Sequence, residues 1–189
     1  MNQKDLILFL NKIEKLKCNT RHSWNSNGRQ ESVAEHSWRL AFMAMLCADE
    51  YPDIDINKVV RMCLIHDIGE AITGDIPSFY KTEQNEAEEE LALSSLLSTL
   101  PHIYEKEFTA LFSEMKALKT KEAKLFKALD NMETLISHNE ADISTWLPLE
   151  YTENLTYGQK NVEWSKWTKE LKEEIKRQSI EKMNKAKAE

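Results

Sequence analysis

The chain has 189 residues, of which 41% are hydrophobic and 30% are charged, as is usual for one globular domain with its own core. The net charge of −7, with no basic stripe, argues against a nucleic-acid partner. With only 4 Gly and 4 Pro, a fold rich in β-hairpins is disfavoured. Leu, Ala, Glu and Lys are abundant and strand-type alternation is scarce, so we expect an all-α fold.

Cysteine usage and hydropathy indicate a protein of the cytoplasm. The three cysteines, Cys18, Cys47 and Cys63, are odd in number and far apart, and the last two lie in apolar helical runs. We therefore expect buried free thiols and a reducing compartment. The N-terminus lacks a signal-peptide pattern, and no apolar run reaches the roughly 20 residues that a membrane span needs. We expect a soluble cytoplasmic protein with no membrane partner.

Helical periodicity and residues typical of helix ends divide the first part of the chain into two predicted helices joined by a predicted loop. Residues 6–16 form the first predicted amphipathic helix, and residues 18–31 are expected to form a loop. Ser32 and Glu35 then match a capping box, in which each side chain satisfies a backbone amide at the start of a helix. This second predicted helix should continue to about Glu50.

Asp55 is a candidate N-cap for the third predicted helix, which Gly74 and Pro77 should close. An irregular, aromatic-rich stretch is expected at 142–158. The remaining predicted helices cover residues 83–99, 101–118, 121–138 and 159–185. We expect about seven helices in a single domain over residues 1–189, with its metal-site core at about 32–140.

The third predicted helix carries the clearest chemical pattern. An unbroken apolar run leads into His66 and Asp67, and Glu70 follows one turn later, so all three lie on one side of the predicted helix. His66 and Asp67 are about 100° apart around the axis, and a metal ion placed between them can bind both. The alternative is the hydrated face of an amphipathic helix, which is the commoner meaning of an isolated His-Asp pair. The apolar run argues for the metal.

Two further residues complete a candidate ligand set. His36 lies in the first turn of its predicted helix, where the helix dipole disfavours the charged imidazole and leaves the neutral form that metals bind. Asp130 borders an apolar stripe and is either a solvated flank or a partner for a positive group in the core. Glu35, next to His36, is interpreted as a cap and not as a ligand.

Two histidines and two aspartates form a nitrogen and oxygen donor set without a thiolate. Such a set argues against a structural zinc finger. It suits a divalent first-row ion such as Mn, Co or Fe, with positions left for water and substrate. Mg is less favoured because imidazole is a poor ligand for it, and Zn is a further alternative.

These residues occur in motifs that together resemble the HD-domain metal-dependent phosphohydrolases. The motifs are Glu31-Ser-Val-Ala-Glu-His36-Ser, His66-Asp-Ile-Gly-Glu70, Thr73-Gly-Asp75-Ile-Pro77 and Lys127-Ala-Leu-Asp130. The resemblance covers about residues 5–140 and is strongest to the 5'-deoxynucleotidase branch. It implies a helical enzyme that releases phosphate from deoxynucleoside 5'-monophosphates by attack of metal-bound water, with Mn or Co as cofactor and a homodimer as the assembly.

The resemblance also implies roles for individual residues. The residues that match the family's metal ligands are His36, His66, Asp67 and Asp130. Glu70 matches its catalytic carboxylate, and Asp75 matches the acid that contacts the deoxyribose hydroxyl. Arg21 matches the arginine that binds phosphate. Considered without the resemblance, Asp75 is equally well an ordinary turn residue.

One position departs from the family pattern. In well-known members a tryptophan directly follows the phosphate-binding arginine, whereas this chain has His22 there. Trp24, two positions later, is a candidate for the same space near the substrate. The exclusion of ribonucleotides is therefore left open.

Two other functions fit the same residues. One is an HD hydrolase that acts on another nucleotide or small phosphate ester, such as a cyclic or signalling nucleotide, because one fold serves many substrates. The other is a non-enzymatic, metal-stabilised helical regulatory module. Arg21, Glu70 and Asp75 argue against the second function, since a purely structural metal site needs none of them.

The remaining conspicuous side chains are expected to have structural roles. Trp146, Trp164 and Trp167 should pack in the core or in a dimer interface in preference to stacking on bases. His102 and His138 are expected on the surface.

Overall fold

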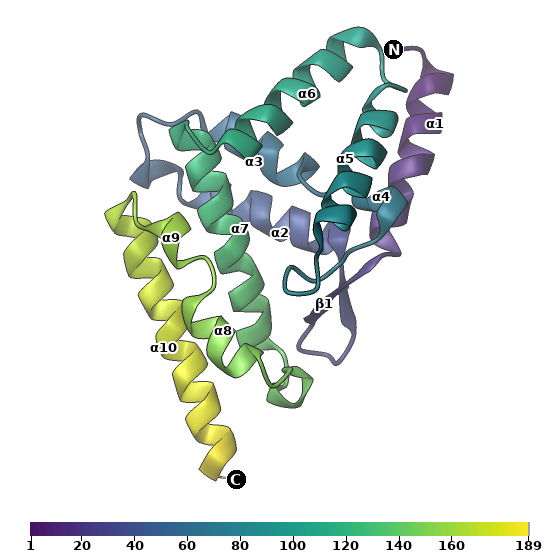
Figure 1. Cartoon of the computed structure of the whole chain (residues 1–189). Helices are drawn as coiled ribbons and strands as arrows, with labels where there is room; N and C mark the ends of the chain where they lie inside the picture. Colours follow the sequence, from purple (N-terminus) through teal and green to yellow (C-terminus); the bar gives the residue numbers. More distant parts are fainter. Residues whose placement is uncertain (189) are drawn as a thin grey trace.

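The computed structural model describes residues 1–188 and is built almost wholly from helices (Figure 1). The α-helices are α1 (Gln3–Ile13), α2 (Val33–Leu46), α3 (Ile56–Ile65), α4 (Glu70–Thr73), α5 (Glu83–Leu97), α6 (His102–Ala117), α7 (Lys121–Glu140), α8 (Glu150–Thr156), α9 (Gln159–Val162) and α10 (Lys166–Ala188). The shorter elements are the 3-10 helices η1 (Glu14–Lys17), η2 (Ala48–Glu50) and η3 (Ile143–Thr145), and the strands β1 (Thr20–Trp24) and β2 (Gln30–Ser32). The predicted all-α fold class is confirmed.

Helix α7 is the central element of the fold and packs against α2, α3, α6 and α10 (Figure 1). Its predicted apolar stripe is buried: Leu125, Leu129 and Met132 are fully covered, and Ile136 packs against the same cluster. Because such a stripe faces the core at helical spacing, the polar residues at its edges are carried into the interior with it. Asp130 is one of them.

The predicted starts of α2 and α3 are confirmed in atomic detail. Ser32 and Glu35 form the reciprocal capping box at the start of α2. Asp55 caps α3, because its carboxylate accepts from the backbone N–H of Lys58 at 3.1 Å. These caps fix the entry of the two helices that carry the histidines of the candidate metal site.

The loop expected at 18–31 is instead a β-hairpin, so that prediction was wrong. Strands β1 and β2 pair antiparallel, and Gly28 allows the turn between them with a φ of +82°. The strands are short and carry no apolar alternation, which left no pattern to detect. The hairpin positions part of the candidate site, because β1 carries Arg21 and His22, which were predicted to bind substrate.

The helix expected to continue from Asp55 to Gly74 is broken at His66. In an unbroken helix the carbonyl of Cys63 would accept from the N–H of Asp67, but His66 Nδ1 approaches this carbonyl at 2.8 Å. Bonds of the i to i+3 type follow, from Ile68 to Ile65 and from Glu70 to Asp67. His66 and Asp67 thus lie at the junction between α3 and the short α4.

The C-terminal part contains more helices than predicted. The stretch 142–158, expected to be irregular, contains α8, and the last predicted helix is divided into α9 and α10. Trp146 is buried, and Trp164 and Trp167 pack against the main core beside Tyr51, as expected for structural tryptophans.

The structure also bears on the predictions about the cysteines and about membrane-spanning helices. Cys47 and Cys63 are buried free thiols, as expected. Across residues 1–188, none of the helices combines the length and apolar character needed to span a bilayer.

The close contact between Gly158 and α7 gives a stability prediction. Gly158 has a φ of +73°, and an added Cβ would lie 2.6 Å from the Cβ of Asn131. Gly158→Ala should therefore lower the free energy of unfolding by about 2–4 kcal/mol, from backbone strain and overpacking. Gly28→Ala is the control, because it has a similar φ but open space, and should cost about 1–2 kcal/mol. Urea unfolding followed by circular dichroism measures both, and equal losses would contradict the packing argument.

Candidate metal centre and active-site cavity

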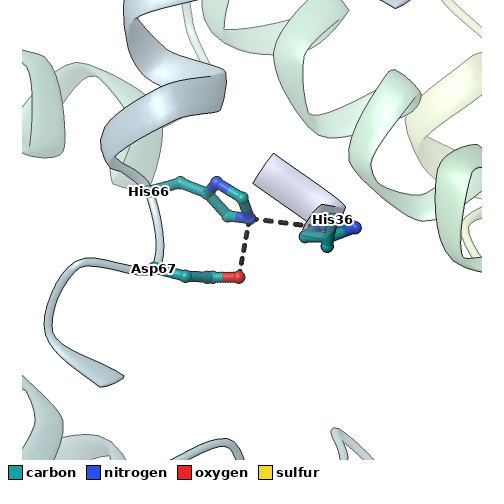
Figure 2. A group of neighbouring side chains, drawn as sticks. All are labelled: His36, His66 and Asp67. Atoms are coloured by element: carbon teal, nitrogen blue, oxygen red, sulfur yellow. Dashed lines mark hydrogen bonds and ion pairs between the residues drawn. The ribbon is translucent and has the colours of Figure 1, made fainter. Parts of the chain in front are cut away.

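The four predicted ligands converge from three parts of the fold. His36 comes from the first turn of α2, His66 and Asp67 from the α3–α4 junction, and Asp130 from the middle of α7. Figure 2 shows His36, His66 and Asp67 directed toward one another, and their ligand atoms all lie within 4.8 Å of each other. Asp130 Oδ1 lies 3.2 Å from His36 Nε2 and 3.6 Å from His66 Nε2.

The spacing of the His36, His66 and Asp67 ligand atoms fits one bound cation, and Asp130 lies beside them. Ligands about 2.1 Å from a single ion, at octahedral or tetrahedral angles, lie about 3.0–3.4 Å apart. The corresponding separations are 3.3 Å between His36 Nε2 and His66 Nε2, and 2.9 Å between His66 Nε2 and Asp67 Oδ2. Two imidazoles and two carboxylates form a donor set suited to a divalent first-row metal.

Both histidines are oriented by a partner on the other ring nitrogen. His36 Nδ1 contacts Glu133, and His66 Nδ1 lies 2.8 Å from the carbonyl oxygen of Cys63. An acceptor at Nδ1 fixes the ring and directs Nε2 toward the metal, which is the usual support of a histidine ligand.

The electrostatics of the centre favour positive charge. The neutral His36 expected from the helix dipole is not favoured in the absence of metal, because burial and Arg21 lower the pKa of His36 but Asp130 and Glu133 outweigh them and raise it to about 9. Burial alone would raise the pKa of Asp67, yet His66 brings it to about 2. Positive charge is therefore favoured at the point where the four ligands meet, and a divalent cation provides it.

Asp130 has a second partner that the ligand pattern did not reveal. Its Oδ2 accepts from Lys127 Nζ at 2.7 Å, which leaves Oδ1 to face the two histidines. Burial acts to raise the pKa of Asp130, but Lys127 and the histidines hold it well below its usual range. Asp130 is thus the buried partner of positive groups and not a solvated flank.

Glu133 is a residue of the site that the sequence analysis missed. It is fully buried one turn after Asp130, and it contacts His36 Nδ1 and, at 2.6 Å, Arg39 Nε. Burial opposes ionisation, but His36 and the arginines lower the pKa of Glu133 to about 2. The available signal was its i+3 spacing from Asp130, which places both acids on one face of α7.

Glu31, His36 and Glu133 form a second group with metal-ligand spacing, but arginines already neutralise its carboxylates. Arg21 Nη1 lies 3.3 Å from Glu31 and 3.6 Å from Glu133, and Arg39 binds Glu133 from the other side. A second dication would have to displace these guanidinium groups. We therefore assign this group to the support of His36.

A cavity of about 160 Å³ opens beside the metal centre. Asp67 and Asp130 form one end of its lining, together with Arg21, Glu70 and Asp75. The three predicted substrate and catalytic residues therefore share one space with two of the candidate metal ligands. Arg21 is held in place by Thr134 Oγ1, which accepts from its Nη2 at 3.1 Å.

Glu70 is a proton-bearing group in this cavity. Burial raises its pKa to about 10, and the neighbouring carboxylates of Asp67 and Asp75 add to the effect. Its Oε2 is buried and has no hydrogen-bond partner among residues 1–188. Asp75 follows Gly74, whose φ is +75°, and burial raises the pKa of Asp75 as well.

His22 and Trp24 were the two candidates for the place that a tryptophan takes near the substrate in the family, and only His22 lies in the cavity wall. His22 lines the cavity, whereas Trp24, at the end of β1 opposite Gln30, is not among the lining residues within the described chain. His138 also lines the cavity and is buried, so its expected place on the surface was wrong, while His102 is exposed as predicted.

A second, larger hollow of about 700 Å³ reaches the centre from another direction. It is lined by His66, Asp67 and Glu70 and extends between α5 and α6. Its wall combines apolar residues such as Phe112 with a cluster of glutamates on α5.

Comparisons with known proteins place the chain in a class and then in a family. It is 34% identical to 5'-deoxynucleotidase HDDC2 of Homo sapiens over 142 residues, which cover 72% of this chain and 68% of that protein. It is 30% identical to 5'-deoxynucleotidase hdd1 of Schizosaccharomyces pombe over 138 residues, which cover 69% of each chain. A structure titled as a predicted metal-dependent phosphohydrolase from Magnetospirillum magnetotacticum MS-1 superposes with a TM-score of 0.81 at 30% identity, covering 97% and 96% of the two chains.

These matches indicate the class of metal-dependent hydrolases. The HD domain family itself matches residues 13–172, and the chain belongs to it, as its motifs predicted.

The contact between Glu133 and His36 gives a prediction about metal binding. Glu133→Gln removes the charge that orients His36, so metal affinity should fall about 10- to 100-fold. Titration calorimetry of the metal-free protein with Mn or Co measures this. Glu140→Gln is the matched control, because Glu140 lies on α7 and pairs with Arg39, as Glu133 does, but is exposed. Equal affinity of both variants would show that Glu133 does not support the centre.

Proposed function

We propose that the protein hydrolyses deoxynucleoside 5'-monophosphates to deoxynucleosides and inorganic phosphate. The observation that carries the proposal is one cavity that joins Asp67 and Asp130 of the candidate metal site to an arginine, a buried glutamate and an aspartate. The relatives named 5'-deoxynucleotidase support the choice of substrate.

The metal site and Arg21 would hold the phosphate. When bound by His36, His66, Asp67 and Asp130, a divalent ion supplies Lewis acidity and lowers the pKa of water. Arg21 supplies a planar guanidinium that can bind two phosphate oxygens at once. Its contacts with Glu31 and Thr134 hold it at the cavity wall before substrate arrives, which reduces the cost of ordering it.

Glu70 would act as the proton donor. When water attacks phosphorus, the bond from phosphorus to the 5'-oxygen breaks and this oxygen requires a proton. Glu70 holds a proton at neutral pH because burial and its acidic neighbours disfavour the carboxylate. We assign it general acid catalysis at the leaving 5'-oxygen.

Asp75 would bind the sugar. Its position directly after Gly74 brings a short carboxylate to the cavity, where it can accept a hydrogen bond from a deoxyribose hydroxyl. His22 occupies the neighbouring part of the wall in place of the family's tryptophan. Histidine is smaller than tryptophan, so the discrimination between ribonucleotides and deoxynucleotides has to be measured directly.

We also propose the identity of the metal and a homodimeric assembly. Two imidazoles in the ligand set favour Mn, Co or Fe over Mg, with Zn as an alternative. The family resemblance implies a homodimer, which analytical ultracentrifugation of the metal-loaded protein would test.

Glu70→Gln tests the catalytic assignment. The substitution preserves size but removes the transferable proton, so kcat should fall about 10²- to 10⁴-fold. Metal content, measured by inductively coupled plasma mass spectrometry, should remain that of the unmodified protein. Full turnover in the metal-replete variant would exclude the assigned role.

A substrate panel tests the function as a whole. The protein, stripped with chelator and reloaded with Mn, Co or Mg, is given the deoxy- and ribonucleoside 5'-monophosphates, and phosphate release is measured. We expect release from the deoxynucleotides with Mn or Co and a loss of at least about 100-fold without metal. Release only from cyclic or other nucleotides would favour a different HD hydrolase. No release from any phosphate ester would favour the regulatory module.

A further inference from the structure

The cavity extends from the metal centre along α7. Asp130, Thr134 and His138 line it at successive turns. The eight residue steps from Asp130 to His138 span about 12 Å at 1.5 Å per residue. This length is comparable to that of an extended nucleoside monophosphate. With the phosphate beside Arg21, the base would therefore reach the part of the cavity near His138.

Four polar side chains form this distal end: His22, His138, Glu150 and Asn154. Asn154 Oδ1 accepts from His138 Nδ1 at 3.0 Å, and Glu150 Oε2 accepts from the backbone N–H of Leu147 at 2.7 Å. Trp146 Nε1 donates to the carbonyl of His138 at 2.9 Å, which ties the group to the core. One end of His138, Glu150 and Asn154 is thus fixed by the protein.

One atom at the other end of two of these groups makes no hydrogen bond within residues 1–188. Glu150 Oε1 and Asn154 Nδ2 are buried and make no hydrogen bond within residues 1–188, and each residue is only 2% exposed. His22 Nε2 and His138 Nε2 approach Glu150 Oε1 to 3.3 Å and 3.7 Å, but neither contact is a hydrogen bond. Buried polar atoms are almost always satisfied, so an unpaired acceptor and an unpaired donor in one cavity indicate a ligand.

We propose that Glu150 Oε1 and Asn154 Nδ2 bind the polar edge of the substrate's nucleobase. The carboxylate accepts from a base N–H, and the amide donates to an adjacent carbonyl oxygen or ring nitrogen. Phe79, which lines the same cavity next to His22, offers an aromatic face for the ring of the base. The inference rests on the proposed function and adds to it a dependence on base identity.

Two isosteric substitutions test the pair. Glu150→Gln retains an oxygen for Leu147 and replaces the free acceptor by an amide donor. Asn154→Asp retains an oxygen for His138 and replaces the free donor by an acceptor. Glu170→Gln on the exposed face of α10 is the control. Thermal unfolding of each variant confirms that the fold is kept.

The first readout is kcat/KM for the four deoxynucleoside 5'-monophosphates and for 2-deoxyribose 5-phosphate, which lacks a base. In the unmodified protein the preferred deoxynucleotide should exceed the baseless ester by about 10- to 100-fold, the contribution of hydrogen bonds that involve a charged group. Each variant should lose most of this advantage and change the order of the bases, while the rate for the baseless ester stays within about twofold. An unchanged order and advantage in both variants would overturn the proposal.

The second readout separates this inference from the proposed function. Equilibrium dialysis measures the binding of unphosphorylated deoxynucleosides to the metal-free protein and needs no turnover. If no monophosphate is hydrolysed but both variants bind nucleosides about 10-fold more weakly, the function fails and the base site stands. If the monophosphates are hydrolysed and nucleoside binding is the same in all variants, the function stands and the base site fails.

Discussion

His36 and Glu133 meet in a fully buried contact between α2 and α7, and the geometry of the metal centre depends on it. The contact determines which nitrogen of His36 faces the other ligands. It also keeps a charged carboxylate in the interior, a position that is stable only when positive groups surround it. Arg21 and Arg39 provide those groups from β1 and α2. One buried acid thus connects three elements that are distant in the sequence.

Charge balance explains why so many acids can be buried in one region. Asp67, Asp130 and Glu133 are each paired with a histidine, a lysine or an arginine. Glu70 makes no such ion pair within residues 1–188, and burial together with the carboxylates of Asp67 and Asp75 raises its pKa. Burial disfavours ionisation of all these acids, and the nearby cations overcome it for Asp67, Asp130 and Glu133 but not for Glu70.

The sequence predicted the features that depend on local pattern. The helices around Leu125 and Leu129 follow from their apolar spacing, and the caps at Ser32 and Asp55 follow from local hydrogen bonding. The break at His66 was not predictable, because it depends on how one imidazole binds a nearby carbonyl. The hairpin of β1 and β2 had no apolar alternation to reveal it.

The residues brought together by tertiary packing were the hardest to predict. Glu133 and His138 are polar residues on a helix whose polar side would ordinarily face water. They are buried because the hairpin and the C-terminal helices cover that side of α7. Glu150 and Asn154 belong to a stretch expected to be irregular, so nothing in their spacing pointed to a cavity. Family motifs predicted the metal ligands but gave no information on this distal wall.

The two hollows on either side of the α3–α4 junction have a consequence for turnover. Asp67 and Glu70 line both, so the reacting phosphate would be accessible from the α5–α6 side even when a nucleoside fills the cavity along α7. Under the proposed function, water could reach the reaction from this side, and the released phosphate could leave by a route that the nucleoside does not occupy. The two products could then depart in either order.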